Sequence, residues 1–208
     1  MTKEFDKDPF FSFSMDDRDF EFRYPPSVIF RADATWHYGR EPVMRRMPDG
    51  SLVCLIYSGG NREPSRENVV LITRSSDNGA TWAKPELLFR HGARCVWATE
   101  LFTDAGTPTM YLHTFSFDSY YYELRTYASA TTDSGKTWSD PRSLPGVAGN
   151  AVVRKGIVTS KGTWLLPVYW TQLLGGFDWS RNAAKAEERG EPALFAGCNW
   201  KFVSGVYR

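Results

Sequence analysis

The sequence predicts an all-β protein, a β-propeller of which about three four-stranded antiparallel blades are present. Two observations carry this prediction. Apolar runs of about four to eight residues, bounded by Gly, Pro, Asn or Asp, follow one another like short strands joined by tight turns. An eight-residue turn also recurs, as SSDNGATW at 75–82 and TTDSGKTW at 131–138. Such a repeat is typical of an array whose units bury their apolar faces against one another.

Composition agrees with this fold class and excludes some partners. The 208 residues include 8 Trp, 10 Tyr and 14 Phe, and such aromatic enrichment favours β-structure. Lys and Arg number 25 against 24 Asp and Glu, so no strong field would attract nucleic acid or an anionic membrane. We therefore expect neither a nucleic-acid nor a membrane partner.

Residues 1–30 form an N-terminal segment that we expect to complete a last blade of the ring. Acidic residues stand where a secretory signal needs basic ones followed by an apolar run. A cytoplasmic protein is expected, and a secreted one stays open if a leader was removed. Cys54, Cys95 and Cys198 have no metal-type spacing, and we expect reduced thiols in the core and no metal site.

The first blade is expected in strands at 41–47, 51–59, 67–75 and 84–89. Pro48, Asp49 and Gly50 form a strong turn signal between the first two, because glycine accepts a positive φ at no steric cost. The first copy of the repeated turn lies between the third and fourth strands.

The same unit recurs twice further along the chain. We expect second-blade strands at 96–102, 109–117, 122–130 and 140–146, and third-blade strands at 150–160, 163–172 and 200–208. Residues 174–192 interrupt the third blade, and the good helix formers of RNAAKAEER predict a surface insertion with a short helix.

Residues 31–208 therefore read as a partial propeller, the N-terminal part of a longer ring. A third copy of the repeated turn would be due just after Arg208. An open ring exposes sheet edges, which predicts self-association through them.

The repeated turn has the pattern Ser/Thr-x-Asp-x-Gly-x-Thr-Trp. Its aspartate can accept hydrogen bonds from nearby backbone N–H groups, its glycine supplies a permissive φ, and its tryptophan can pack between sheets. We interpret the two aspartates, Asp77 and Asp133, as parts of stable turns and not as catalytic groups.

Two such turns in register with the strands resemble the Asp boxes, or BNR repeats, of the sialidase superfamily, whose fold is a six-bladed β-propeller. The resemblance covers about residues 38–208. In that family an Arg-x-Pro motif opens the first inner strand and its arginine binds the substrate carboxylate. Arg40-Glu41-Pro42 stands at the corresponding position, and a guanidinium can hold a carboxylate by two parallel hydrogen bonds.

The family also implies a general acid, usually an aspartate, in the loop before the strand that leads to the first box. Here that loop is SGGNREPSREN, which carries Glu63 and Glu67 and no Asp, a departure from the family pattern. We prefer Glu67 as the proton donor because it is nearer to the strand. The family's tyrosine nucleophile and further arginines belong to later blades, so this chain alone is expected to be inactive.

Further candidates stand near the expected central cavity. Trp97 and Glu100 lie in the second inner strand, where a ring could stack on a sugar and a carboxylate could act as a second acid or base. His37, His113, Arg154 and Tyr169 are further candidates for substrate contacts. For Trp97 and His113, packing in the core is the competing interpretation.

The function that this resemblance implies is a glycoside hydrolase that acts on an acidic glycan without a cofactor. Two alternatives remain open: a non-catalytic propeller that binds a glycan or a protein, and a polysaccharide lyase-like enzyme that uses His37, His113 and Tyr169.

Overall fold

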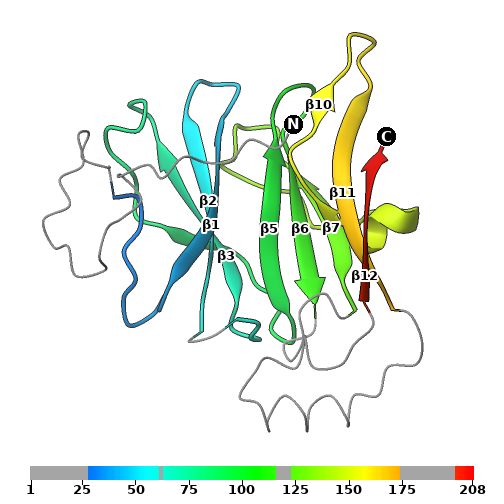
Figure 1. Cartoon of the computed structure of the whole chain (residues 1–208). Coiled ribbons are helices and arrows are strands. Elements are labelled where there is room, and N and C mark those ends of the chain that lie inside the picture. The colour runs from blue at the N-terminus through cyan, green and yellow to red at the C-terminus, as the bar shows by residue number, and fades with distance from the viewer. Residues whose placement is uncertain (1–27, 61–62, 116–122, 174–199) are drawn as a thin grey trace, which may run out of the picture.

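The structure, a computed structural model, describes residues 28–60, 63–115, 123–173 and 200–208. These residues form three four-stranded antiparallel sheets (Figure 1). The predicted helical insertion at 174–192 and most of the N-terminal segment lie outside the described residues, as does Cys198. Cys54 and Cys95 are free thiols in the core.

The first sheet has the order β1-β2-β3-β4 and the second the order β5-β6-β7-β8, so each neighbour in the chain is a neighbour in space. Their bounds are β1 Gly39–Arg46, β2 Leu52–Ser58, β3 Val69–Ser75, β4 Glu86–Phe89, β5 Cys95–Phe102, β6 Thr109–Phe115, β7 Arg125–Ala130 and β8 Arg142–Ser143.

The third sheet follows a short 3-10 helix at Gly146–Asn150 and contains β9 Val152–Val153, β10 Ile157–Val158, β11 Trp164–Leu173 and β12 Trp200–Tyr207. The strand expected at 150–160 is divided into β9 and β10, which both pair with β11. A Cβ atom on Gly156, between them, would lie 2.4 Å from the carbonyl oxygen of Leu165. Only glycine allows this close approach of the two chains.

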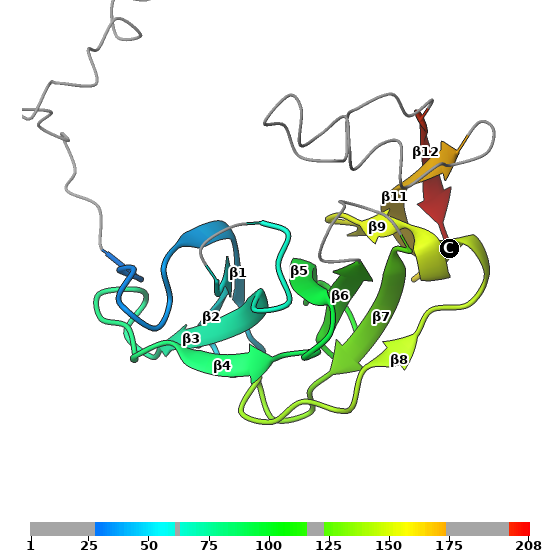
Figure 2. The same ribbon diagram turned by 90° about the horizontal axis from the view of Figure 1, so that it is seen from below.

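Seen from below, the three sheets stand side by side in an arc (Figure 2). The strands β1, β5 and β9 lie along its concave side, whereas β4 and β8 lie along the convex side. β5 contacts both β1 and β9. The first strand of each sheet is therefore its inner strand.

Successive residues of a strand point to opposite faces, and both faces of the first two sheets are covered. Val53, Leu55, Val70 and Ile72 pack with residues of β5 and β6 between the first and second sheets. Cys54, Ile56, Val69 and Leu71 occupy the other face of the first sheet, where Ile29, Phe30 and Trp36 pack against them. This two-sided burial explains why the strands read as continuous apolar runs.

The two copies of the repeated turn have the same hydrogen bonds. Asp77 accepts from the backbone N–H of Thr81 at 2.9 Å and from its hydroxyl at 2.5 Å, and Ser75 donates to Asp77 at 2.7 Å. Asp133 accepts the equivalent three bonds from Thr137 and Thr131 at 2.8, 2.6 and 2.8 Å. Both carboxylates are thus used inside their turns.

The second of these turns also ties the first two sheets together. The side chain of Arg74 in β3 donates a hydrogen bond to the carbonyl oxygen of Gly135. A Cβ atom on Gly135, whose φ is 85°, would lie 3.4 Å from side-chain atoms of Met47 and Val53. Glycine therefore meets both the backbone and the packing demands of this position.

Candidate functional site

Arg40 stands at the N-terminal end of the first inner strand, where the pairing of β1 with β2 is irregular. Arg40 is paired with Tyr57, and the register shifts between Arg40 and Val43. Glu41, inside this bulge, has a φ of 46°, an uncommon conformation for a residue other than glycine. Bulges of this kind re-aim side chains at strand ends. The side chain of Arg40 is 58% exposed.

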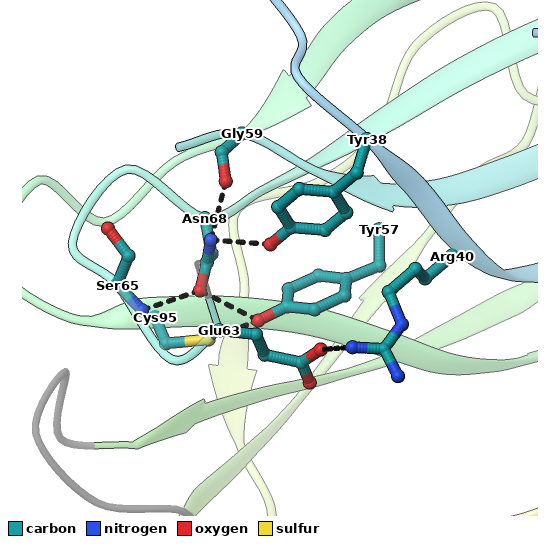
Figure 3. Close-up of polar contacts among 8 residues, drawn as sticks. All are labelled: Tyr38, Arg40, Tyr57, Gly59, Glu63, Ser65, Asn68 and Cys95. Carbon is teal, nitrogen blue, oxygen red and sulfur yellow. Dashed lines mark hydrogen bonds and ion pairs between the residues drawn. The ribbon is translucent and has the colours of Figure 1, made fainter. Parts of the chain in front are cut away.

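The guanidinium of Arg40 forms an ion pair with Glu63, and the two atoms Nη1 and Oε2 are 2.5 Å apart (Figure 3). The side chain of Glu63 is 14% exposed. The loop between β2 and β3 thus brings a largely buried carboxylate to the arginine of the Arg-x-Pro motif. Glu63, and not the preferred Glu67, is the glutamate that contacts Arg40.

Asn68 fixes the loop that carries Glu63. Its side-chain oxygen accepts hydrogen bonds from the backbone N–H of Ser65 at 2.6 Å and from the hydroxyl of Tyr57 at 2.8 Å. Its side-chain nitrogen donates to the carbonyl of Gly59 at 2.6 Å and to the hydroxyl of Tyr38 at 2.7 Å (Figure 3). Asn68 is fully buried, so both ends of the loop depend on one side chain.

Tyr57 lies beside the ion pair (Figure 3) and is kept neutral. Its hydroxyl is 3.0 Å from the sulfur of Cys95, and its ring is only 2% exposed. Burial raises the pKa of Tyr57 far above its ordinary range, with the neighbouring Cys95 adding to the effect. Burial likewise raises the pKa of Cys95 to about 12. Neither group is poised to ionise and act as a nucleophile.

A strip of aromatic rings runs from this cluster toward the third blade. The rings of Tyr38 and Tyr57 meet edge to face, with centroids 5.9 Å apart, and those of Tyr57 and Trp97 are 6.5 Å apart. Arg154 then lies over Trp97 and over Tyr169, at 5.3 and 5.7 Å from the ring centroids. The structure thus brings together three of the predicted substrate-binding residues, Trp97, Arg154 and Tyr169.

Glu100 lies away from this group of residues. It is three residues beyond Trp97 along β5, about 10 Å at ~3.3 Å per residue. Its buried carboxylate accepts hydrogen bonds from Arg45 of β1, at 3.0 Å from Nε and 2.6 Å from Nη2. Burial raises the pKa of Glu100, and the charge of Arg45 opposes that rise. This geometry gives Glu100 a role in joining two inner strands.

His113 lies in the core and not at an open site. It is fully buried, and its two ring nitrogens are 2.6 Å from the hydroxyl of Thr99 and 3.1 Å from that of Thr126. Burial lowers the pKa of His113 to about 3, so the imidazole is neutral at pH 7. The hydroxyls of Thr99 and Thr126 also contact the carbonyls of Val153 and Ala151, which links the second blade to the third.

His37 and Glu67 both line a separate cavity of about 580 Å³. Trp36, Arg66 and Arg90 are among its other lining residues. Neither Arg40 nor Glu63 lines this cavity. Of the three residues proposed for a lyase, His37 lines this cavity, whereas His113 packs in the core against Trp97 and Tyr169 lies under Arg154.

Within the described ranges, no group of three or more His, Cys, Asp or Glu residues could hold a metal ion. In the same part of the chain, no helix has the length and apolar character that crossing a bilayer requires.

Three four-stranded antiparallel sheets with their inner strands side by side (Figure 2) have the arrangement of blades in a sialidase-like β-propeller. Among solved structures, the chain is similar to the Hadza microbial sialidase Hz136, with a TM-score of 0.52 and 16% sequence identity. The match covers 64% of this chain and 32% of that sialidase, so the chain spans about a third of its length. No family model and no curated protein matches the sequence. At this identity the likeness shows the fold alone.

Proposed function

We propose that this chain is part of a glycoside hydrolase that acts on an acidic glycan. Arg40 binds the carboxylate of the sugar, and Glu63 is the general acid. The observation that carries this proposal is the ion pair of Arg40 and Glu63 at the head of the first inner strand of a sialidase-like fold. An exposed arginine fork beside a largely buried carboxyl group suits the recognition of one charge and the transfer of one proton.

In the proposed mechanism the substrate changes the partner of Arg40. A sugar carboxylate that binds the guanidinium competes with Glu63 for the same N–H donors. A largely buried carboxyl group that loses its positive partner favours the protonated, neutral form. Glu63 can then donate this proton to the glycosidic oxygen as the bond to the anomeric carbon breaks. One water molecule supplies the hydroxyl of the released sugar, and its second proton returns to Glu63.

Because this chain alone is expected to be inactive, the proposal is tested on a protein that also carries the later blades, with fluorogenic glycosides that differ in the sugar: a sialoside, a glucuronide and a rhamnoside. We expect the two acidic glycosides to be hydrolysed and the neutral rhamnoside to remain intact. Arg40→Gln should lower kcat/KM for the acidic substrate by about 10²-fold, because a charge-assisted pair is lost. Arg142→Gln, an exposed arginine of the outer strand β8, is the matched control.

A second candidate function is a glycan-binding propeller without catalysis. Glycosidases generally use two catalytic groups. In the described part of the chain, Arg40 forms an ion pair with one carboxylate, that of Glu63, and this favours binding without catalysis. Binding of the acidic sugar that depends on Arg40, with no release of the fluorophore by any of the three substrates, would support this function over hydrolysis.

A further inference from the structure

We propose that Arg154 forms a second anion-binding subsite, so that the ligand is an acidic oligosaccharide with two charged groups and not a single terminal acidic sugar. The group that Arg154 would bind is an anionic substituent, a carboxylate or a sulfate, on the sugar next to the one held by Arg40. This inference rests on the proposed function and names its substrate class.

Arg154 is held in place by its backbone and by two rings. Its N–H donates to the carbonyl of Pro167 at 2.9 Å, directly after β9. Its guanidinium carbon lies 5.3 Å from the centre of the Trp97 ring and 5.7 Å from that of Tyr169, and Nη2 is 3.5 Å from the hydroxyl of Tyr169. These are the distances of cation–π contacts.

The platform below Arg154 is rigid. Trp97 is only 5% exposed, and its ring packs against those of His113 and Phe115, with centroids 5.8 and 6.5 Å away. A buried ring packed on several sides cannot change its rotamer freely. The arginine head that rests on it is therefore partly ordered before a ligand arrives, which lowers the entropy cost of binding.

The charge of Arg154 is available to a ligand. Arg40, Arg45 and Arg94 each form an ion pair with a glutamate, whereas no ion pair of Arg154 is found within the described residues. A cation–π contact uses the face of the guanidinium and leaves its in-plane N–H donors at the edge. Since Arg154 is exposed, those donors can bind a carboxylate or sulfate in the bidentate manner.

Arg40 and Arg154 flank the same aromatic strip. The Glu63 carboxylate paired with Arg40 is close enough to Tyr57 to contribute to the raised pKa of that phenol. Tyr57 contacts Trp97, and Arg154 lies over Trp97. In the strand pairing, Arg40 is opposite Tyr57, and Val152, two residues before Arg154, is opposite Tyr169. The rings of Tyr57 and Trp97 are themselves buried, so a chain of sugars would lie on the surface above them and place one acidic group at each arginine.

The test is a calorimetric titration of the protein with uronate oligomers of one, two and three sugars, and with sulfated neutral oligomers of the same lengths. The monomer is expected to bind with an affinity that depends on Arg40 alone. For every oligomer that is long enough to reach both arginines, Arg154→Gln should weaken binding about tenfold or more. Arg154→Lys, which keeps the charge and loses the fork, should weaken it less. The uronate and sulfate series show which anion the subsite prefers.

Lys155→Gln is the matched control, because it removes the same charge from the adjacent exposed residue. If Arg154→Gln leaves the affinity for every oligomer unchanged, or weakens the monomer as much as the trimer, the second subsite is overturned while binding at Arg40 stands. If Arg40→Gln has no effect but longer oligomers still depend on Arg154, the anion subsite stands and the proposed function fails. If no oligomer binds, both fail.

Discussion

The hydroxyl of Tyr57 donates a hydrogen bond of 2.8 Å to the side-chain oxygen of Asn68, and both groups are buried. This bond joins the second strand of the first blade to the end of the loop that carries Glu63. Because Asn68 also bonds Gly59, Ser65 and Tyr38, it determines where that loop runs.

Asn68→Ala should therefore destabilise the protein and misplace Glu63. The substitution leaves buried donors and acceptors without partners, and we expect a loss of about 3 kcal/mol in the free energy of unfolding. The measurement is a urea titration followed by tryptophan fluorescence. Hydrolysis of the acidic glycoside should fall even under conditions where the variant is fully folded.

The control for this variant is Asn150→Ala. Asn150 accepts a hydrogen bond of 2.6 Å from Arg125 in an exposed setting, so its loss should change stability by less than about 1 kcal/mol. Equal effects of the two substitutions would contradict the role that we give to Asn68.

The repeated turns should make stability depend on acid pH. Hydrogen bonds from Thr81, and then from Ser75, lower the pKa of Asp77 to about 2, below the ordinary value of 3.8. An aspartate whose folded pKa is depressed contributes stability above its unfolded pKa, and this stability is lost as the pH falls through the folded pKa. We expect the urea midpoint to fall between about pH 4 and pH 2 in the wild type.

Asp77→Asn isolates this contribution, because the amide does not titrate. The variant should be less stable than the wild type at pH 7, and the difference should shrink as the pH approaches 2. Asp104→Asn, in an exposed turn of the second blade, should follow the wild type at every pH. A constant difference between Asp77→Asn and the wild type across this range would show that the turn does not depend on the charge.

Removal of Arg45 should leave Glu100 as a buried charge without a partner. The Glu100 side chain is 3% exposed and that of Arg45 is 22% exposed, so we expect Arg45→Ala to cost about 3 kcal/mol at pH 7. Burial already raises the pKa of Glu100, and loss of Arg45 removes the group that opposes this rise. Stability of the variant should therefore be regained as the pH falls below 7, because a raised pKa lets Glu100 bind a proton at a higher pH than an ordinary glutamate.

Chemical unfolding of Arg45→Ala at several pH values measures this effect. In the double variant Arg45→Ala/Glu100→Gln the recovery at acid pH should disappear, since the amide has no charge to neutralise. Recovery of the same size in the double variant would assign the pH dependence to another group.

The blades could be predicted from sequence because their signals are local. The hydrogen bonds of Asp77 reach Ser75 and Thr81, two and four residues away, so the eight-residue pattern contains the whole turn. Two such turns, each preceded by short apolar strands, were enough to indicate repeated antiparallel sheets, as observed.

The partners of the candidate site residues could not be predicted in this way, because they are distant in sequence. Asn68 bonds Tyr38 across 30 positions, and Glu100 bonds Arg45 across 55. Glu63 and Glu67 are indistinguishable by composition and lie in one loop. The course of that loop, set by Asn68, places Glu63 against Arg40 and Glu67 at a separate cavity. The one available signal was Asn68 itself, which ends the loop and directly precedes β3, a strand buried at all but one position.

Glu63 and Glu67 can be separated by kinetics. We expect Glu63→Gln to lower kcat for an alkyl glycoside of the acidic sugar by about 10²- to 10⁴-fold, because the proton donor to the leaving oxygen is lost. An aryl glycoside with a strongly acidic phenol as leaving group needs little protonation, so its kcat should fall much less. The glutamine retains the shape of Glu63 and can still accept a hydrogen bond from Arg40.

Glu67→Gln is the matched variant in the same loop, and it should change kcat by less than about threefold on either substrate. The comparison of the two leaving groups distinguishes loss of a proton donor from simple displacement of the loop, which would slow both substrates alike. If Glu67→Gln shows the leaving-group dependence and Glu63→Gln does not, the proton donor is Glu67, and the pair of Arg40 and Glu63 serves only to shape the site.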